Sequence, residues 1–188
     1  MTLRICITGP EATGKSSLTQ ALARQFNCPW VPEYARIYLK ELGRPYQEED
    51  LETILEGQIA LENEAASSAG EYLFCDTGPE VVWVWSHYKY GRVSPRIDAV
   101  TRSHSYPLTL LLEIDLPWAA DPLRENPSEI ERKNLLQIYK MLLKQIGNEH
   151  AIISGSGKIR TSNAIRAIQH YRKGASVSEE IKKPPLML

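Results

Sequence analysis

The chain has 188 residues, of which 43% are hydrophobic and 24% are charged, and its formal net charge is −1. These values suit one globular domain with its own core, and the near-neutral charge argues against a surface built for nucleic acid or an anionic membrane. No apolar run approaches the roughly 20 residues that cross a bilayer, no signal peptide precedes the first strand, and the three cysteines lack metal-ligand or paired spacing, so we expect a cytoplasmic protein.

Predicted strands and helices alternate along the chain. Apolar runs predict strands at residues 3–8, 72–76, 108–114 and 151–154, and two prolines hold residues 29–33 in a short extended edge strand. The strand at 108–114 is apolar on both faces, as central strands of parallel sheets are. Amphipathic spacing and turn signals predict helices at residues 17–25, 35–42, 47–68, 79–91, 94–104 and 160–171.

One further helix is expected after Asn126, with that residue as its cap, Pro127 at its first position and Gly147 as its stop. The tail from Lys173 lacks periodicity and is expected to be flexible. Together the elements predict a single α/β domain over residues 1–172, a parallel sheet with helices on both faces. The helix after Asn126 is expected to turn a stripe toward the core that consists of Ile130, Leu135, Ile138, Leu142 and Ile146.

The motif with the most specific chemistry follows the first strand, where residues 9–16 read GPEATGKS. They match the phosphate-loop pattern G-x-x-x-x-G-K-[ST] without a mismatch. Backbone N–H groups of such a loop and the N-terminus of the following helix surround phosphates, while the lysine reaches the β- and γ-phosphates and the serine hydroxyl binds Mg²⁺. We therefore expect a phosphate-loop NTPase fold that binds ATP and Mg²⁺, with ATP phosphates held by Gly9, Glu11, Ala12, Thr13, Gly14, Lys15, Ser16 and Ser17.

Two acidic residues are predicted at strand ends beside this loop. Glu33 ends the short edge strand and Asp76 ends the strand at 72–76, at the sheet edge where open α/β folds bind ligands. Phosphoryl transfer can use one carboxylate to orient Mg²⁺ and another to accept or align an acceptor hydroxyl; Asp76 is the expected metal-side group, together with Ser16. Arg124 lies in a polar segment at 115–126, which we interpret as a small lid. The plainer alternatives are a helix cap for Glu33 and a surface arginine for Arg124.

The motifs exclude two other classes of phosphate-loop protein. A GTP switch would carry glycine three residues after the strand-end aspartate, where this chain has Pro79, and an Asn-Lys-x-Asp tetrapeptide that is absent. A ring-forming ATPase would need a longer chain with an arginine-bearing C-terminal half. The remaining layout is that of kinases for nucleosides and small metabolites.

The most specific pieces beyond the phosphate loop are Pro-Glu-Tyr-x-Arg at 32–36 and Pro-Trp-x-x-Asp-x-x-Arg at 117–124. Further pieces are Gly57-Gln58, residues 74–77, 84–86 and 89–91, and Arg160. Together they span almost the whole chain, which resembles the ribosylnicotinamide kinase domain of NadR proteins and their stand-alone relatives.

This resemblance implies ATP- and Mg²⁺-dependent phosphorylation of the 5′-hydroxyl of nicotinamide riboside, giving nicotinamide mononucleotide for NAD synthesis. By position, Glu33 and Asp76 would serve the hydroxyl and the metal, Lys15 the phosphates, and Arg124 would be the lid arginine. An aromatic ring would stack on the pyridinium through a cation–π contact. The residues implied around the acceptor are Tyr34, Arg36 and Gln58, with Trp30 or Trp118 as the stacking ring.

The resemblance is incomplete at one position. The family usually continues Asp-Thr with a second acid, and this chain has Gly78 there. The adenylyltransferase and DNA-binding parts of NadR proteins have no counterpart in the sequence, so we expect a small-molecule partner and neither of those activities. Two alternatives stay open: a kinase for another nucleoside or small hydroxyl metabolite, and a regulatory module that binds ATP without transferring phosphate.

Overall fold

A five-stranded parallel sheet forms the centre of the computed structural model, which describes residues 2–174. The strands lie in the order β2-β3-β1-β4-β5, so the short strand β2 is at an edge, as its prolines predicted. The tail expected to be flexible lies almost wholly outside the described residues. The strands are β1 (Leu3–Thr8), β2 (Trp30–Val31), β3 (Tyr72–Asp76), β4 (Leu108–Leu112) and β5 (His150–Ile153).

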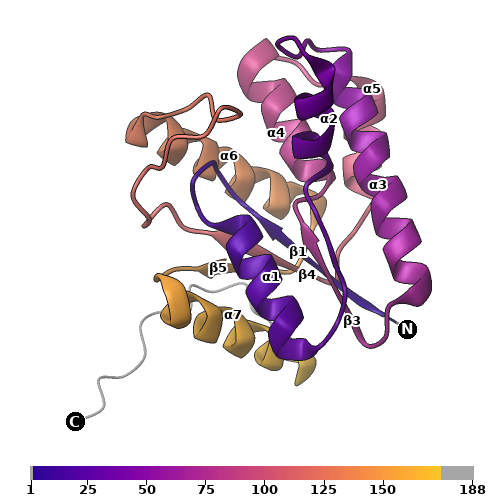
Figure 1. Cartoon of the computed structure of the whole chain (residues 1–188), viewed down its shortest axis with the longest axis vertical. Helices are drawn as coiled ribbons and strands as arrows, with labels where there is room; N and C mark the ends of the chain where they lie inside the picture. Colours follow the sequence, from indigo (N-terminus) through magenta and orange to yellow (C-terminus); the bar gives the residue numbers. More distant parts are fainter. Residues whose placement is uncertain (1, 175–188) are drawn as a thin grey trace.

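Helices cover both faces of the sheet, which confirms the predicted α/β fold. Helices α1 (Lys15–Phe26) and α7 (Gly157–Arg172) pack on one face, where Leu22 and Ile168 are buried against Phe74 and Leu110. The other helices build a second core beyond the opposite face (Figure 1). They are α2 (Tyr34–Leu42), α3 (Asp50–Ser68), α4 (Pro79–Tyr90), α5 (Pro95–Ser103) and α6 (Glu129–Ile146). Within residues 2–174, none of the helices is both long enough and apolar enough to cross a membrane.

The start of α6 differs from the prediction. Ser128, and not Asn126, is the N-cap residue, and its hydroxyl accepts a hydrogen bond from the Glu131 N–H. Asn126 instead donates hydrogen bonds to Glu11 of the phosphate loop. Ile130 was expected in the core and is 72% exposed. At about 100° per residue, it lies some 140° around the helix from the buried Leu135.

The turn after β3 explains why this chain has glycine at position 78. A Cβ atom on Gly78 would lie 2.4 Å from the Tyr106 hydroxyl and 2.7 Å from a Glu80 carboxylate oxygen. Both of those side chains are buried, so neither can move aside easily. The space that the family's usual second acid would need is therefore filled by Tyr106 and Glu80.

Gly78→Ala is expected to destabilise the protein by about 1–3 kcal/mol, because an added methyl group overpacks this turn. The measurement is the free energy of unfolding from urea titrations. Gly70→Ala is the matched control, since a Cβ there meets nothing within 4 Å. Equal stabilities of the two variants would contradict the steric explanation.

Candidate active site

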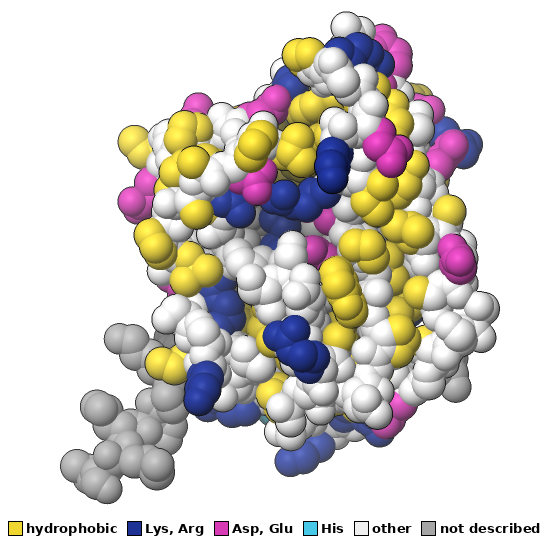
Figure 2. All heavy atoms as spheres, viewed as in Figure 1, with side chains coloured by type: hydrophobic (Ala, Val, Ile, Leu, Met, Phe, Trp, Pro, Cys, Tyr) yellow, Lys and Arg dark blue, Asp and Glu magenta, His cyan; other side chains and the backbone are white. Residues whose placement is uncertain are grey.

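A pocket opens where the phosphate loop meets the carboxyl ends of β1 and β3. Its floor is formed by residues 9–17, and its walls come from α2, α4, α6 and the segment at 115–126. Figure 2 shows Lys and Arg side chains gathered in the hollow between these walls. The residues outside the loop that line it are Glu33, Ala35, Arg36, Leu39, Val81, Trp85, Leu123, Arg124, Asn126, Leu135 and Tyr139.

The phosphate loop takes its shape from close packing against β4. Gly9 has a φ of +139°, and a Cβ atom there would lie 3.0 Å from the Leu112 carbonyl oxygen, so only glycine fits this position. The Lys15 ammonium donates to the carbonyls of Gly9 and Pro10 at 2.9 and 3.0 Å. The one flexible cation of the loop is therefore already curled over the place where phosphates are expected.

Arg160 from α7 supports the loop from behind. Its side chain is buried and donates to the carbonyls of Thr13, Glu113 and Gly155 and to the Asp115 carboxylate. Burial lowers the pKa of Arg160 to about 10. One guanidinium thus ties the phosphate loop to the ends of β4 and β5. The sequence marked Arg160 only as a matching residue, because nothing in its spacing predicted contact with Thr13.

Asp76 is the buried carboxylate of the site. It is 2% exposed, and its Oδ1 atom is buried without a hydrogen-bond partner. Burial and then the charge of Glu33 raise the pKa of Asp76 to about 6, while Ser16, Lys15 and Arg36 act in the opposite direction. An acceptor-only atom held beside the Ser16 side chain in this way is suited to a divalent cation.

Glu33 stands at the start of α2, between the sheet and the pocket. It is the N-cap residue of α2, but its side chain makes no capping hydrogen bond, so capping is not how this carboxylate is used. It pairs instead with the Arg36 guanidinium at 3.2 Å and lines the pocket. Both carboxylates predicted at strand ends therefore lie beside the phosphate loop.

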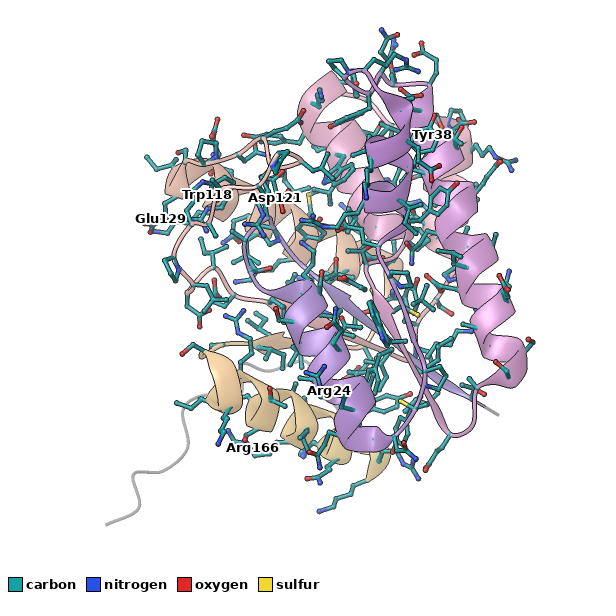
Figure 3. All side chains as sticks on the ribbon, in the orientation of Figure 1. Arg24, Tyr38, Trp118, Asp121, Glu129 and Arg166 are labelled. Carbon is teal, nitrogen blue, oxygen red and sulfur yellow. The ribbon has the colours of Figure 1, made fainter. Side chains whose placement is uncertain are left out.

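Several contacts hold the segment at 115–126 over the pocket, and one of them is the ion pair of Glu125 with Lys89 of α4 at 3.0 Å. The Asp121 carboxylate pairs with Arg36 at 3.1 Å, and Figure 3 shows Asp121 on the side of this segment that faces α2. Glu11 of the phosphate loop accepts hydrogen bonds from the backbone N–H groups of Glu125 and Asn126. Between these contacts Arg124 lines the pocket. The arrangement is that of a strap across the phosphate site.

The aromatic residues expected around the acceptor are placed differently. Trp30 lines a separate depression with Arg24 and Cys28 at the far end of α1, because it is the first residue of β2 and not the residue that follows the strand. Trp118 packs against two arginines, with its ring centre 5.8 Å from Arg124 Cζ and 5.4 Å from Arg132 Cζ. Neither tryptophan lines the pocket. The aromatic side chains that do are Trp85 and Tyr139.

Sequence reasoning missed both rings. The sequence marks Trp85 only as part of the matching piece at 84–86, and Tyr139 lies outside the stripe that orients α6. The signal available was spacing, since Tyr139 falls four residues after Leu135, on the same side of the helix. Trp85 similarly falls four residues after Val81, and all four residues line the pocket.

Of the polar residues expected around the acceptor, only Arg36 lines the pocket. Gln58 is 3% exposed and bonds to the backbone of Tyr34 and Thr77. The Tyr34 ring packs against Gly57, where an added Cβ would lie 2.0 Å from it. Gln58 is thus a buried residue whose amide is hydrogen-bonded within the protein, and it does not line the pocket as the resemblance implied.

Comparison with known proteins identifies the domain. Residues 4–160 match the family model described as an AAA domain. The chain belongs to this family. Among curated proteins, it is similar to the protein named Trifunctional NAD biosynthesis/regulator protein NadR, with 31% identity to that of Salmonella typhimurium and 30% to that of Escherichia coli over 145 residues. Each match covers 75% of this chain and 35% of the relative, so the chain corresponds to part of NadR. The resemblance drawn from the motifs is confirmed at this level.

Solved structures confirm the fold. A NadR protein in complex with NR superimposes with a TM-score of 0.79 at 21% identity, covering 95% of this chain and 53% of that chain. A NadR complex with NAD and AMP-PNP gives 0.75 at 21% identity, covering 100% and 52%. Thymidylate kinase from Ehrlichia chaffeensis gives 0.65 at 12% identity, covering 89% and 98%. The fold of this AAA-family domain is therefore that of nucleoside and nucleotide kinases.

Asp76→Asn is expected to stabilise the nucleotide-free protein at pH 7.5 but not at pH 4. The pKa of Asp76 is about 6 in the folded protein and about 3.9 in an unfolded chain. Between these values the folded state binds more protons at Asp76, so the contribution of this carboxyl to the stability of the wild type falls as the pH rises from 4 to 6. The asparagine variant lacks this fall and should be more stable by on the order of 1–3 kcal/mol at pH 7.5.

Urea unfolding at the two pH values measures this difference. Asp98→Asn is the control of opposite sign, because Arg102 and Trp83 lower the pKa of Asp98. A stability difference between Asp76→Asn and wild type that is the same at pH 4 and pH 7.5 would contradict the assignment.

Proposed function

We propose that the protein is a kinase that transfers the γ-phosphate of ATP to the 5′-hydroxyl of a nucleoside, with nicotinamide riboside as the leading acceptor and nicotinamide mononucleotide as its product. One observation carries the proposal: Glu33 and Arg124 line the pocket over the phosphate loop, and the buried Asp76 carboxylate lies close enough to Ser16 and Lys15 for both to lower its pKa. The similarity to NadR, whose solved complex contains NR, supports this choice of acceptor.

ATP would be bound by its phosphates. The loop and the N-terminus of α1 supply backbone N–H groups and a positive dipole for the β- and γ-phosphates. Lys15 would exchange its hydrogen bonds with the carbonyls of Gly9 and Pro10 for contacts with phosphate oxygens. Because those carbonyls already hold the ammonium near the loop, the movement required is short.

Mg²⁺ would be held by Ser16 and by Asp76, directly or through water. The unpartnered Oδ1 of Asp76 fits this role. Among the described residues no group of three or more His, Cys, Asp and Glu side chains could hold a metal alone, and Mg²⁺ bound together with nucleotide phosphates needs only one or two protein ligands. When bound, the ion neutralises charge on the phosphates during transfer.

Glu33 would act on the acceptor hydroxyl. Its carboxylate lines the pocket beside the phosphate loop, where it can orient the hydroxyl and accept its proton as the bond to phosphorus forms. The ion pair with Arg36 fixes the direction of the carboxylate. This gives the two acids separate tasks, Asp76 on the metal and Glu33 on the hydroxyl.

The base of the nucleoside would lie against Trp85 or Tyr139, the aromatic side chains that line the pocket. A pyridinium ring carries a positive charge and is attracted to the face of an aromatic ring within about 6 Å. Arg124, on the strap over the phosphates, would neutralise charge on the transferring phosphoryl group, and this interaction strengthens in the transition state. The strap would also exclude water and so favour transfer over hydrolysis.

The test is ADP release from Mg-ATP in the presence of a panel of acceptors: nicotinamide riboside, the common ribo- and deoxyribonucleosides, and no acceptor. Release that depends on nicotinamide riboside supports the proposal. ADP release stimulated only by another nucleoside would identify that nucleoside as the acceptor in place of nicotinamide riboside. Slow ADP release that no acceptor changes would favour a regulatory ATP-binding module.

Lys15→Ala is expected to lower acceptor-dependent turnover by a hundredfold or more, on the order of 3 kcal/mol of transition-state stabilisation. Folding should be unaffected, because this lysine contributes charge and little packing. The matched control is Lys133→Ala, whose ammonium makes an exposed ion pair with Glu129 on α6 and whose turnover should equal that of the wild type. Near-normal turnover in folded Lys15→Ala would exclude this loop as the donor site.

A further inference from the structure

The two carboxylates of the site come from separate parts of the chain, and the sheet does not fix their separation. Strand β2 pairs with β3 only at Trp30 with Phe74 and at Val31 with Cys75. Glu33 lies two residues beyond the last of these pairs on β2, and Asp76 one residue beyond it on β3. Something other than the strand ladder must therefore hold these two junctions together.

Gln58 of α3 contacts both junctions. Its Oε1 accepts a hydrogen bond of 2.8 Å from the N–H of Tyr34, the residue after Glu33. Its Nε2 donates to the carbonyl of Thr77, the residue after Asp76, at 3.3 Å. A single side chain thus bonds to the backbone immediately beyond each carboxylate.

Gln58 is itself held in one orientation by a buried polar chain. Its Nε2 also donates to Oε1 of Glu62 at 3.4 Å, which sets the amide so that its oxygen faces Tyr34. Glu62 is fully buried; Tyr106 donates to the same Oε1 at 2.7 Å, and His104 lies 3.0 Å from Oε2. Buried and fully partnered groups of this kind have little freedom to rotate.

Gly57, the residue before Gln58, allows α2 to approach α3 closely. Gly57 lacks the Cβ atom that would lie 2.0 Å from the Tyr34 ring. The Tyr34 ring can therefore pack directly on α3. This packing places the Tyr34 N–H within hydrogen-bond distance of the Gln58 amide. The Gly57-Gln58 pair works as a unit, with the glycine providing the close approach and the amide providing the two hydrogen bonds.

We propose that Gln58 is a positioning residue for phosphoryl transfer, one that sets the separation of Glu33 and Asp76 by clamping the backbone after each. The inference rests on the proposed function of the pocket. The primary amide of glutamine offers an acceptor for Tyr34 and a donor for Thr77 on two separate atoms of one side chain. Glutamate would lose the donor and face Glu62, and methionine would lose both groups. Displacing reacting groups by about 1 Å can cost two orders of magnitude in rate.

The test compares Gln58→Met with two controls. Gln137→Met makes the same change at an exposed position of α6. Ile168→Ala removes packing from the core cluster on the opposite face of the sheet and controls for lost stability. With ATP and the best acceptor, we expect Gln58→Met to lower kcat at least tenfold while KM for each substrate stays within twofold of wild type. Gln58→Glu should behave like Gln58→Met, and both controls should retain wild-type kcat below their unfolding temperatures.

A second variant tests the buried hydrogen bonds that orient the Gln58 amide. Tyr106→Phe removes one hydrogen bond to Glu62 and should lower kcat less than Gln58→Met does. If both act through the same amide, the double variant Gln58→Met/Tyr106→Phe should be no slower than Gln58→Met alone. If the losses in kcat of the two single variants multiply in the double variant, Tyr106 does not act through the Gln58 amide.

The outcomes separate this inference from the proposed function. If Gln58→Met raises KM for the acceptor and leaves kcat unchanged, the clamp is overturned and Gln58 is an acceptor-binding residue. Wild-type kinetics in Gln58→Met would also overturn the clamp. A wild type inert with every acceptor would refute the proposed function, and the clamp is then decided by hydrogen exchange of the Tyr34 amide, followed by NMR. We expect this amide to exchange at least tenfold faster in Gln58→Met than in wild type; an unchanged rate would overturn the clamp.

Discussion

The burial of the Asp76 carboxylate beside the phosphate loop is the constraint on which the pocket depends. A buried acid without a full set of partners is costly, and burial accordingly raises the pKa of Asp76 to about 6. The surroundings balance it with cations, because Lys15 and Arg36 both favour its charged form. Bound phosphates and a divalent cation would complete this balance. The free protein thus keeps a strained arrangement that its ligands are suited to relieve.

The topology explains why so many groups meet at one place. Strand β1 lies between β3 and β4, so the chain leaves β1 toward one side of the sheet and later returns on the other. Open α/β sheets bind ligands in the crevice at such a reversal. The loop after β1 contributes the phosphate site, the turn after β3 contributes Asp76, and the segment after β4 crosses above both. Arg160 and Gln58 then join these separate turns by hydrogen bonds to their backbones, which positions groups that no single strand could hold.

The sequence predicted the parts of this molecule that follow from local patterns. The alternation of apolar runs and helical stripes was sufficient for the parallel sheet and for helices on both faces. The phosphate loop was recognisable because each of its residue types has a local reason. Glu33 and Asp76 were found because strand ends in such sheets share an edge. The boundaries of helices were predicted less accurately. Helix α6 starts at Glu129 and not at residue 127, because the position of a cap depends on the path of the segment before the helix.

What could not be predicted depends on contacts between distant residues. Trp30 is an exposed-strand aromatic like many others in sequence, and only the path of β2 shows that it faces Arg24 and not the pocket. Trp85 and Tyr139 line the pocket because α4 and α6 pack beside each other. The substitution at Gly78 was visible as a departure from the family. Its cause, the Tyr106 hydroxyl from a segment nearly thirty residues further along the chain, was visible only in three dimensions.

We propose above that the pocket passes a phosphoryl group from ATP to a nucleoside hydroxyl. The most direct measurement follows the label from ATP carrying ³²P at the γ-position, incubated with Mg²⁺, the protein and nicotinamide riboside, with the products separated by chromatography. We expect the label to appear in nicotinamide mononucleotide, in an amount equal to the ADP formed. Label recovered only as inorganic phosphate, with nicotinamide riboside unchanged, would contradict it.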